Sequence, residues 1–172
     1  MSPGTVRTDS APTGPPAQAP AEVGAPAPAF ALPDEHGVQC AVGDYLSGRG
    51  ALVVFYPFAF SSICGGELQE LREKLPVFQR EAVNVVAVSC DPMYALRVYA
   101  DRETFGFPLL SDFWPHGEAA RAYGVFDEER GCARRGSFLV DAAGAIRWSV
   151  VNPIHEARPF QAYREALAHL DG

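Results

Sequence analysis

Apolar runs and helix-spaced apolar positions alternate along the chain from residue 51 onward. The unbroken apolar run 51–56 predicts a buried strand, and residues 83–89, β-branched and mostly apolar, predict a central strand. Between the two strands, the apolar residues recur at the spacing of one helix face: Leu68, Leu71, Leu75 and Phe78. Pro76 falls inside this pattern and should kink the helix, because it lacks an N–H donor and crowds the preceding turn.

The second half of the chain continues the same alternation. Asp91 and Pro92 predict an N-cap and a first helical residue for a helix that runs to about Thr104. The further elements predicted from the pattern are a short strand at 107–112, a short helix at 118–123, a hairpin of strands 135–140 and 145–150, and a helix from Pro159. This order predicts an α/β fold, a mixed sheet flanked by helices.

The domain organisation follows from composition. Residues 1–22 are rich in Pro and Ala with few large apolar groups, which predicts a disordered tail. Residues 23–172 form the predicted domain, and 34–42 read as a hairpin or turn that feeds a short strand. We find no internal repeat and no second linker.

Composition and charge exclude several classes of protein. With 172 residues, 48% of them hydrophobic, the chain can bury a core without stabilisation by disulfides or metals. A net charge of −7 argues against nucleic acid or an anionic membrane as partner, and no apolar run approaches the roughly 18 residues of a membrane span. The N-terminus has no apolar segment of a secretory signal, and four irregularly spaced cysteines favour a reducing, cytoplasmic setting. The four histidines lack the spacing of metal ligands, so we expect no metal site.

Cys64 is the strongest candidate for chemistry. It follows the strand 51–56 and a proline-marked loop, and it opens the predicted helix. A thiol at a helix N-terminus faces unpaired backbone N–H groups and the positive end of the helix dipole, both of which favour thiolate. Because the segment contains no Cys-x-x-Cys, dithiol–disulfide exchange of the thioredoxin type is disfavoured.

These residues resemble a known family. Pro57-x-x-x-Ser61-x-x-Cys64 is similar to the peroxiredoxin signature Pro-x-x-x-Thr/Ser-x-x-Cys, and residues 107–112 and 135–141 resemble later segments of that family in the right order. The resemblance covers about residues 23–171 and implies a thioredoxin-like fold. A finer resemblance is to the AhpE-like one-cysteine peroxiredoxins of actinobacteria. It rests on Phe60, on Gly66-Glu67-Leu68 and on Ser111-Asp112-Phe113-Trp114-Pro115-His116-Gly117.

The resemblance implies reduction of hydroperoxides with Cys64 as the peroxidatic cysteine. A free cysteine is a few per cent thiolate at pH 7, so complete ionisation accelerates attack only about 30-fold. The site must therefore also polarise the O–O bond and stabilise the leaving oxyanion. Arg135 is the expected donor for this task, Ser61 a hydroxyl for the thiolate or peroxide, Pro57 a shield of the sulfur, and Glu67 the group that orients Arg135.

Several alternatives stay open at this stage. Arg134 could take the place of Arg135, Ser61 could act as a helix N-cap as well, and Glu67 could simply complement the helix dipole. The loop 114–116 is expected to be structural or part of an interface. Phe58, Phe60 and Ile63 indicate either tolerance for organic peroxides or ordinary packing.

The sulfenic acid left on Cys64 must be reduced by a thiol. The resemblance implies an external one, mycothiol, mycoredoxin or a thioredoxin-like protein. It also implies a homodimer and no cofactor. Cys90, expected at the end of the central strand, and Cys132, expected on the strand of Arg135, are alternative internal resolvers, whereas Cys40 is expected in the core. A redox-relay or chaperone module and a thiol–disulfide oxidoreductase are the competing functions.

Overall fold

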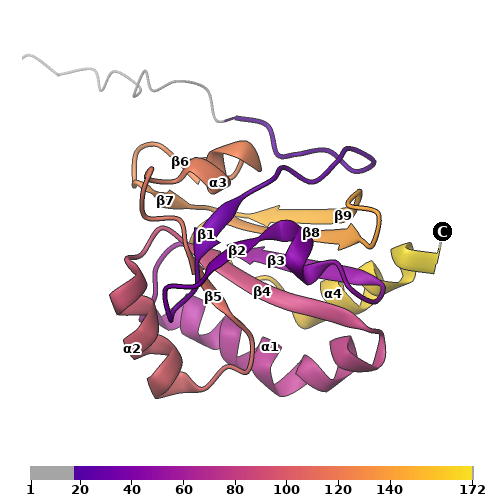
Figure 1. Ribbon diagram of the computed structural model, residues 1–172, viewed down its shortest axis with the longest axis horizontal. Helices are drawn as coiled ribbons and strands as arrows, with labels where there is room; N and C mark the ends of the chain where they lie inside the picture. Colours follow the sequence, from indigo (N-terminus) through magenta and orange to yellow (C-terminus); the bar gives the residue numbers. More distant parts are fainter. Residues whose placement is uncertain (1–17, 172) are drawn as a thin grey trace, which may run out of the picture.

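A five-stranded mixed sheet forms the centre of the molecule (Figure 1), in a computed structural model that describes residues 18–171. The strand order is β5-β4-β3-β8-β9. In chain order the bounds are β3 Gly50–Phe55, β4 Val83–Ser89, β5 Leu109–Ser111, β8 Arg135–Asp141 and β9 Ile146–Asn152. β3 pairs with β4 in parallel and with β8 antiparallel, so the two strands predicted as buried lie side by side in the interior of the sheet.

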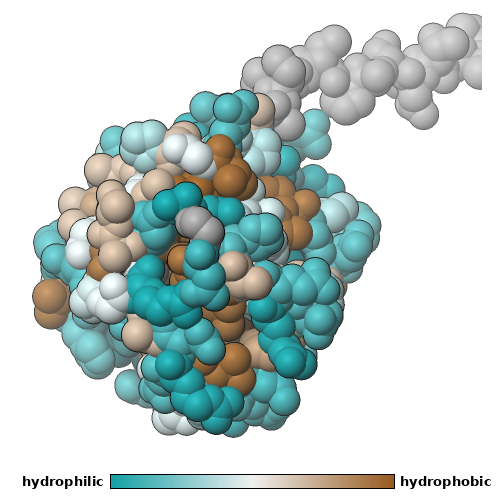
Figure 2. All heavy atoms as spheres, turned by 90° about the vertical axis from the view of Figure 1, so that its right-hand side faces the viewer, coloured by the Kyte–Doolittle hydropathy of each residue, from teal (hydrophilic) through white to brown (hydrophobic). Residues whose placement is uncertain are grey.

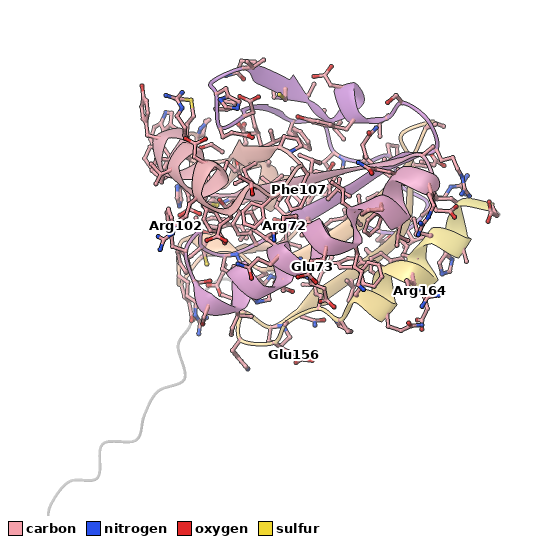
Figure 3. All side chains as sticks on the ribbon, turned by 90° about the horizontal axis from the view of Figure 1, so that it is seen from below. Arg72, Glu73, Arg102, Phe107, Glu156 and Arg164 are labelled. Carbon is pink, nitrogen blue, oxygen red and sulfur yellow. The ribbon has the colours of Figure 1, made fainter. Side chains whose placement is uncertain are left out.

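Four helices flank the sheet, as the alternation of elements predicts. Their bounds are α1 Ser62–Arg80, α2 Met93–Glu103, α3 Glu118–Ala122 and α4 Phe160–Leu167. Buried residues of α1, α2 and α4 share one core cluster with alternate residues of β3, such as Leu52 and Val54. Val53 and Phe55, which point the other way, pack with α3 and β1 in a second cluster. Figure 3 shows α1 and α4 on the first of these faces, with charged side chains such as Glu73 and Arg164 labelled on them.

Pro76 lies inside α1, where the sequence places it. The start of α2 differs from the sequence prediction. The prediction that Asp91 caps α2 is wrong: Pro92 is the extended residue before the helix, and α2 begins at Met93. The Asp91 carboxylate instead accepts a hydrogen bond from the N–H of Ala59 (2.8 Å), so it braces the loop that precedes Cys64.

Short elements complete the fold. β1 (Ala31–Pro33) and β2 (Gln39–Ala41) form the predicted early hairpin, followed by a 3-10 helix at Val42–Tyr45, and a second 3-10 helix at Ala168–Asp171 follows α4. β6 (Phe126–Asp127) and β7 (Cys132–Ala133) form a small ribbon of their own. The expectation that Cys132 shares a strand with Arg135 is therefore wrong, because the chain leaves β7 before it enters β8.

The domain's contacts extend N-terminally of residue 23, the boundary expected from composition. The N–H of Ala21 donates to the carbonyl of Tyr123 (3.0 Å), and the Ala21 side chain packs against the second core cluster. Residues 1–17 of the predicted tail lie outside the described residues. Over the described part of the chain, no helix has the length and apolar character needed to cross a membrane.

Candidate active site

Cys64 lies in the first turn of α1 and is fully buried. Ser61 is the N-cap: its backbone is extended (φ −71°, ψ 148°), its side-chain oxygen accepts from the Cys64 N–H (3.4 Å), and its carbonyl accepts from the Gly65 N–H (2.9 Å). Phe60 adopts a left-handed conformation (φ 67°), which is costly for a non-glycine residue and turns the chain sharply into the helix. The predicted N-terminal placement of the cysteine is thus present, and Ser61 does cap the helix.

Arg135 is the first residue of β8, and its side chain contacts the first turns of α1, which are distant from it in sequence. Its side chain is buried, with 2% exposed. Its Nε donates to the carbonyl of Ile154 and its Nη1 to the Glu67 carboxylate. Within residues 18–171 no hydrogen bond uses the remaining terminal nitrogen, Nη2, so this guanidinium keeps a donor to spare.

Glu67, one turn after Cys64, is a buried carboxylate that bridges two arginines. Burial by itself would raise its pKa, but the hydrogen bonds and charge of Arg158, together with the charge of Arg135, outweigh burial, and the net pKa is lowered. Glu67 is therefore an ionised acceptor at neutral pH. A role limited to the helix dipole does not account for this arrangement.

Arg158 is the residue that the sequence analysis missed. Its Nε donates to Glu67 Oε2 (2.9 Å) and its Nη2 to Oε1 (3.1 Å), a two-pronged contact across 91 positions of sequence. Its Nη1 donates to the carbonyls of Phe55 (2.7 Å) and Gly136 (2.9 Å), which ties the ends of β3 and β8 together. Its only sequence signal is that it precedes Pro159 at a helix start, and that does not mark a buried ion pair.

A cavity of about 180 Å³ opens beside this network. Its walls include Pro57, Phe58, Ser61, Ile63, Arg135 and Ile154. Four of the five sequence-predicted site residues (Pro57, Ser61, Arg135 and, through Arg135, Glu67) therefore surround the helix turn that carries the fifth, Cys64. Its polar lining residues are Arg135, Ser61, Ser62 and His155, and the other walls are apolar.

Arg134, the alternative to Arg135, faces elsewhere. Its Nη2 donates to the carbonyls of Gln18 (3.0 Å) and Gly124, away from the cavity. Arg134 lies in the break between β7 and β8, and of the two arginines only Arg135 contacts Glu67.

The other cysteines are free and lie apart from Cys64 in different ways. Cys90 belongs to the second core cluster, on the opposite face of the sheet from the cluster of Cys64. Burial, followed by the charge of Asp112, raises the pKa of Cys90 to about 12, and burial, followed by the charge of Asp127, raises that of Cys132 to about 11. Both thiols are protonated and poorly nucleophilic at neutral pH. Cys40 is half-buried against the second cluster.

The loop after β5 has the structural character expected of it. The Trp114–Pro115 peptide bond is cis, and the Trp114 side chain is 81% exposed. His116 holds the loop to its surroundings, with Nδ1 3.1 Å from the carbonyl oxygen of Phe113 and Nε2 2.7 Å from that of Gly131.

Known proteins match most of the chain. The model of the AhpC/TSA family matches residues 23–149. Alkyl hydroperoxide reductase E of Mycobacterium tuberculosis is 43% identical over 148 residues, 86% of this chain and 97% of the relative. A putative peroxiredoxin in the rubredoxin operon of Clostridium pasteurianum is 30% identical over 148 residues, 79% of this chain and 82% of the relative.

Solved structures agree with the fold. The crystal structure of Enterococcus faecalis AhpC superposes with a TM-score of 0.76 at 30% identity, covering 85% of this chain and 90% of that one. Peroxidoxin BcpB from Mycobacterium tuberculosis superposes with a TM-score of 0.75 at 25% identity, covering 87% and 96%. Sequence, fold and site thus agree, and the chain belongs to the AhpC/TSA family as a peroxiredoxin of the AhpE-like class, a thiol-dependent peroxidase with a thioredoxin-like fold.

Proposed function

We propose that Cys64 is the peroxidatic residue and that Arg135, Ser61, Pro57 and Glu67 support it. The Cys64 thiolate attacks one oxygen of a hydroperoxide ROOH, the O–O bond breaks, and the products are the Cys64 sulfenic acid and RO⁻, which takes up a proton as ROH. The free Nη2 of Arg135 donates to the developing oxyanion, and Ser61 holds the helix start. Pro57, which is buried, excludes water from the sulfur.

The main support for this proposal is the net charge of the buried group formed by two arginines and one glutamate. Two arginines and one carboxylate, Arg135, Arg158 and Glu67, sum to +1 (two positive charges minus one) in a region with almost no exposed surface. Among the described residues no second carboxylate bonds to either guanidinium. A buried uncompensated charge is costly, so the network favours an anion beside it. A Cys64 thiolate is that anion.

The proximity of the sulfur to the network has independent support. Burial by itself would lower the pKa of Arg158, but the nearby charges of Tyr163, Glu67 and Cys64 raise it. Arg158 is thus a permanent cation within electrostatic reach of Cys64, a residue that could hold the thiolate even where Arg135 is occupied by peroxide.

The test is the mass of the protein after one equivalent of hydrogen peroxide. We expect the intact chain to gain one oxygen atom, trapped by dimedone on Cys64, with no loss of two hydrogens to an internal disulfide. Cys40→Ser should behave like the unaltered protein, and Cys64→Ser should gain nothing. Oxygen on another cysteine, or oxidation that survives in Cys64→Ser, would contradict the assignment.

The sulfenic acid is reduced by an external thiol in this proposal. The placement of Cys90 across the sheet and the raised pKa values of Cys90 and Cys132 support a one-cysteine cycle over internal resolution. Mycothiol, mycoredoxin or a thioredoxin-like protein are the reductants that the AhpE-like class suggests. Four free cysteines support a reducing compartment, the cytoplasm.

A homodimer is the proposed assembly, formed through the exposed apolar side chains of α2 and of the loop after β5. Tyr94 and Val98 of α2 are 71% and 59% exposed, and Phe113 and Trp114 of the loop 47% and 81%. By contrast, Figure 2 shows the end of the molecule at which the chain terminates, where apolar side chains form small groups separated by polar ones. Large exposed apolar side chains favour association.

Replacing Trp114 by glutamate should therefore shift the protein from dimer to monomer in sedimentation velocity runs, because a charge would be buried in the interface. Val23→Glu is the matched control, since Val23 is 58% exposed and lies outside this patch. A monomeric unaltered protein, or equal dissociation of the two variants, would refute the interface.

A further inference from the structure

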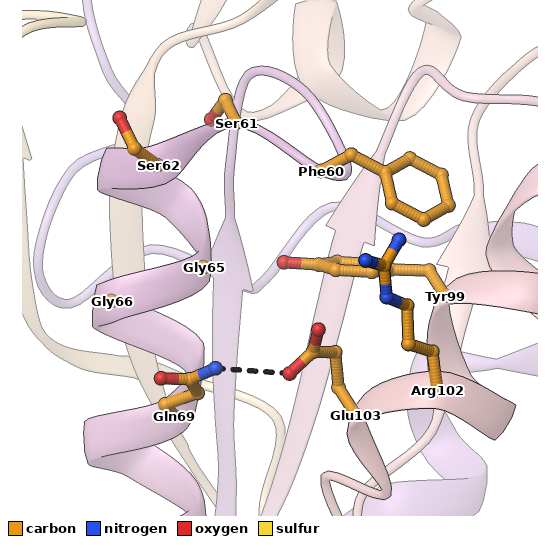
Figure 4. A pocket seen from close by; sticks show the side chains of 9 residues that line it. All are labelled: Phe60, Ser61, Ser62, Gly65, Gly66, Gln69, Tyr99, Arg102 and Glu103. Carbon is orange, nitrogen blue, oxygen red and sulfur yellow. Dashed lines mark hydrogen bonds between the residues drawn. The ribbon is translucent and has the colours of Figure 1, made fainter.

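A second cavity flanks the helix turn that carries Cys64, on the side away from Arg135. It measures about 310 Å³ and lies between the first turns of α1 and the last turn of α2 (Figure 4). Ser61 and Ser62 line both cavities, so the two meet at the residues just before Cys64. One side of this turn therefore faces Arg135, and the other faces α2.

The second cavity contains polar groups without partners. Tyr99 is 2% exposed, yet its hydroxyl has no hydrogen-bond partner among the described residues. This hydroxyl lies 3.5 Å from the position that a Cβ of Gly65 would take, directly beside the residue after Cys64 (Figure 4). Burial, followed by the charge of Cys64, raises the pKa of Tyr99 to about 12, so the group is an O–H donor. A buried, unused donor aimed into a cavity indicates a missing acceptor.

The rim of the cavity adds one charge of each sign. Arg102 projects in front of the Tyr99 ring (Figure 4), and within residues 18–171 its side chain has no ion pair or hydrogen bond. Glu103 receives one hydrogen bond, from Gln69 Nε2 to Oε2 (2.9 Å), which leaves Oε1 free. The cavity thus offers a cation, an anion and a neutral donor, a set that suits a small molecule with both a carboxylate and an N–H or O–H group.

The chemistry of the second half-reaction needs such a site. Displacement at sulfur is in line, so the attacking thiol sulfur and the departing oxygen lie on opposite sides of Cys64 Sγ. If Arg135 holds the oxygen, the attacking thiol must arrive from another side of the helix turn. The α2 cavity borders the same turn on another side, and Gly65 and Gly66 leave part of its α1 wall without side chains.

We propose that this cavity binds the body of the reducing agent, a low-molecular-weight thiol with a carboxylate for Arg102 and a hydrogen-bond donor for Glu103. The inference rests on the proposed one-cysteine function. The bound thiol RSH attacks the sulfenic sulfur, the S–O bond breaks, and the hydroxide leaves with the thiol proton as water, so that Cys64–S–S–R remains. A second RSH cleaves this disulfide, which restores the Cys64 thiol and releases RSSR.

The test uses two probe thiols that differ only in charge, N-acetylcysteine and N-acetylcysteine amide. Each reduces the full-length protein after its oxidation by one equivalent of peroxide, and the ratio of the two rate constants cancels their general reactivity. We expect Arg102→Gln to lower the acid-to-amide ratio about fourfold, the order of a partly exposed charge contact. Arg80→Gln, an exposed arginine in the last turn of α1, should leave the ratio unchanged.

A second variant fills the cavity. A Cβ at Gly66 would meet no atom within 4 Å, so Gly66→Leu places a side chain in open space without a clash and should slow both probe thiols. An unchanged ratio in Arg102→Gln, unchanged rates in Gly66→Leu, reduction by a redoxin protein but by neither probe, or an equal loss in the oxidation step would each overturn the proposal. If the unaltered protein forms no sulfenic acid, the proposed function itself fails, and that result is distinct from all of these.

Discussion

Arg135→Met is expected to slow the reaction with hydrogen peroxide by about 100-fold or more, the usual effect of removing one donor to a developing oxyanion. The variant keeps an unbranched side chain in place of the aliphatic part of arginine but loses the free Nη2 and the contact with Glu67. The oxidation rate is measured by stopped-flow tryptophan fluorescence, since Trp114 and Trp148 are present. The rate of peroxide consumption in steady state should fall by the same factor when oxidation limits turnover.

Arg134→Met is the control for this experiment. Arg134 precedes Arg135 and carries the same charge, but its guanidinium bonds to Gln18 and Gly124. We expect a rate within about threefold of the unaltered protein, because a charge outside the cavity is largely screened. A large loss in Arg134→Met with normal activity in Arg135→Met would reverse the assignment of the donor.

Glu67→Gln is expected to destabilise the fold by about 3–5 kcal/mol, because it leaves two arginines buried without their carboxylate. Urea denaturation of the variant and the unaltered protein measures the difference. In the double variant Glu67→Gln/Arg158→Met, the second change removes one of the two buried charges that have lost their carboxylate. The loss in free energy of unfolding of the double variant should therefore be smaller than the sum of the losses of the two single variants. Additive losses would show that the two groups do not interact.

The difference in stability should also depend on pH. The pKa of Glu67 is lower in the folded chain than the value of about 4.3 for an unfolded glutamate. The unfolded state therefore binds the proton first as the pH falls, and the stabilisation from Glu67 is complete above the unfolded pKa and lost as the pH drops through the folded one. The difference in free energy of unfolding between the unaltered protein and Glu67→Gln should be constant from about pH 6 upward and become smaller below about pH 4. A gap that widens on acidification would contradict the lowered pKa.

The sequence predicted most strands and helices of this chain, because the apolar spacing within each segment is typical of one type of element. The apolar run before Pro57 and the β-branched run 83–89 became β3 and β4, and the residues at helical spacing became the buried face of α1. The observed ends of elements differ from the predicted ones where a tertiary contact uses a side chain that could otherwise cap a helix. Asp91 has the side chain of an N-cap, but it bonds to Ala59 in the loop before Cys64 instead.

The site was predictable in part. Pro57, Ser61, Cys64 and Glu67 lie within one short segment, and the cavity and the helix cap assemble from that segment and Arg135. Arg158 was not predictable, because its partners lie in β3, α1 and β8 and no local spacing records them. The faces occupied by Cys90 and Cys132 were equally hidden, since they depend on the register of β4 and on the turn between β7 and β8.

The separation of Cys64 from Cys90 by the sheet has a consequence for inactivation. In the proposed one-cysteine cycle no internal thiol traps the oxidised sulfur of Cys64, so it persists until a thiol arrives from solution, and a second equivalent of hydrogen peroxide would convert it to the sulfinic acid with release of water. The competition between these two events is set by the ratio of oxidant to reductant. The sulfinic acid is not reduced by thiols, so the inactive fraction of the enzyme grows each time peroxide reacts with the sulfenic acid before a thiol does.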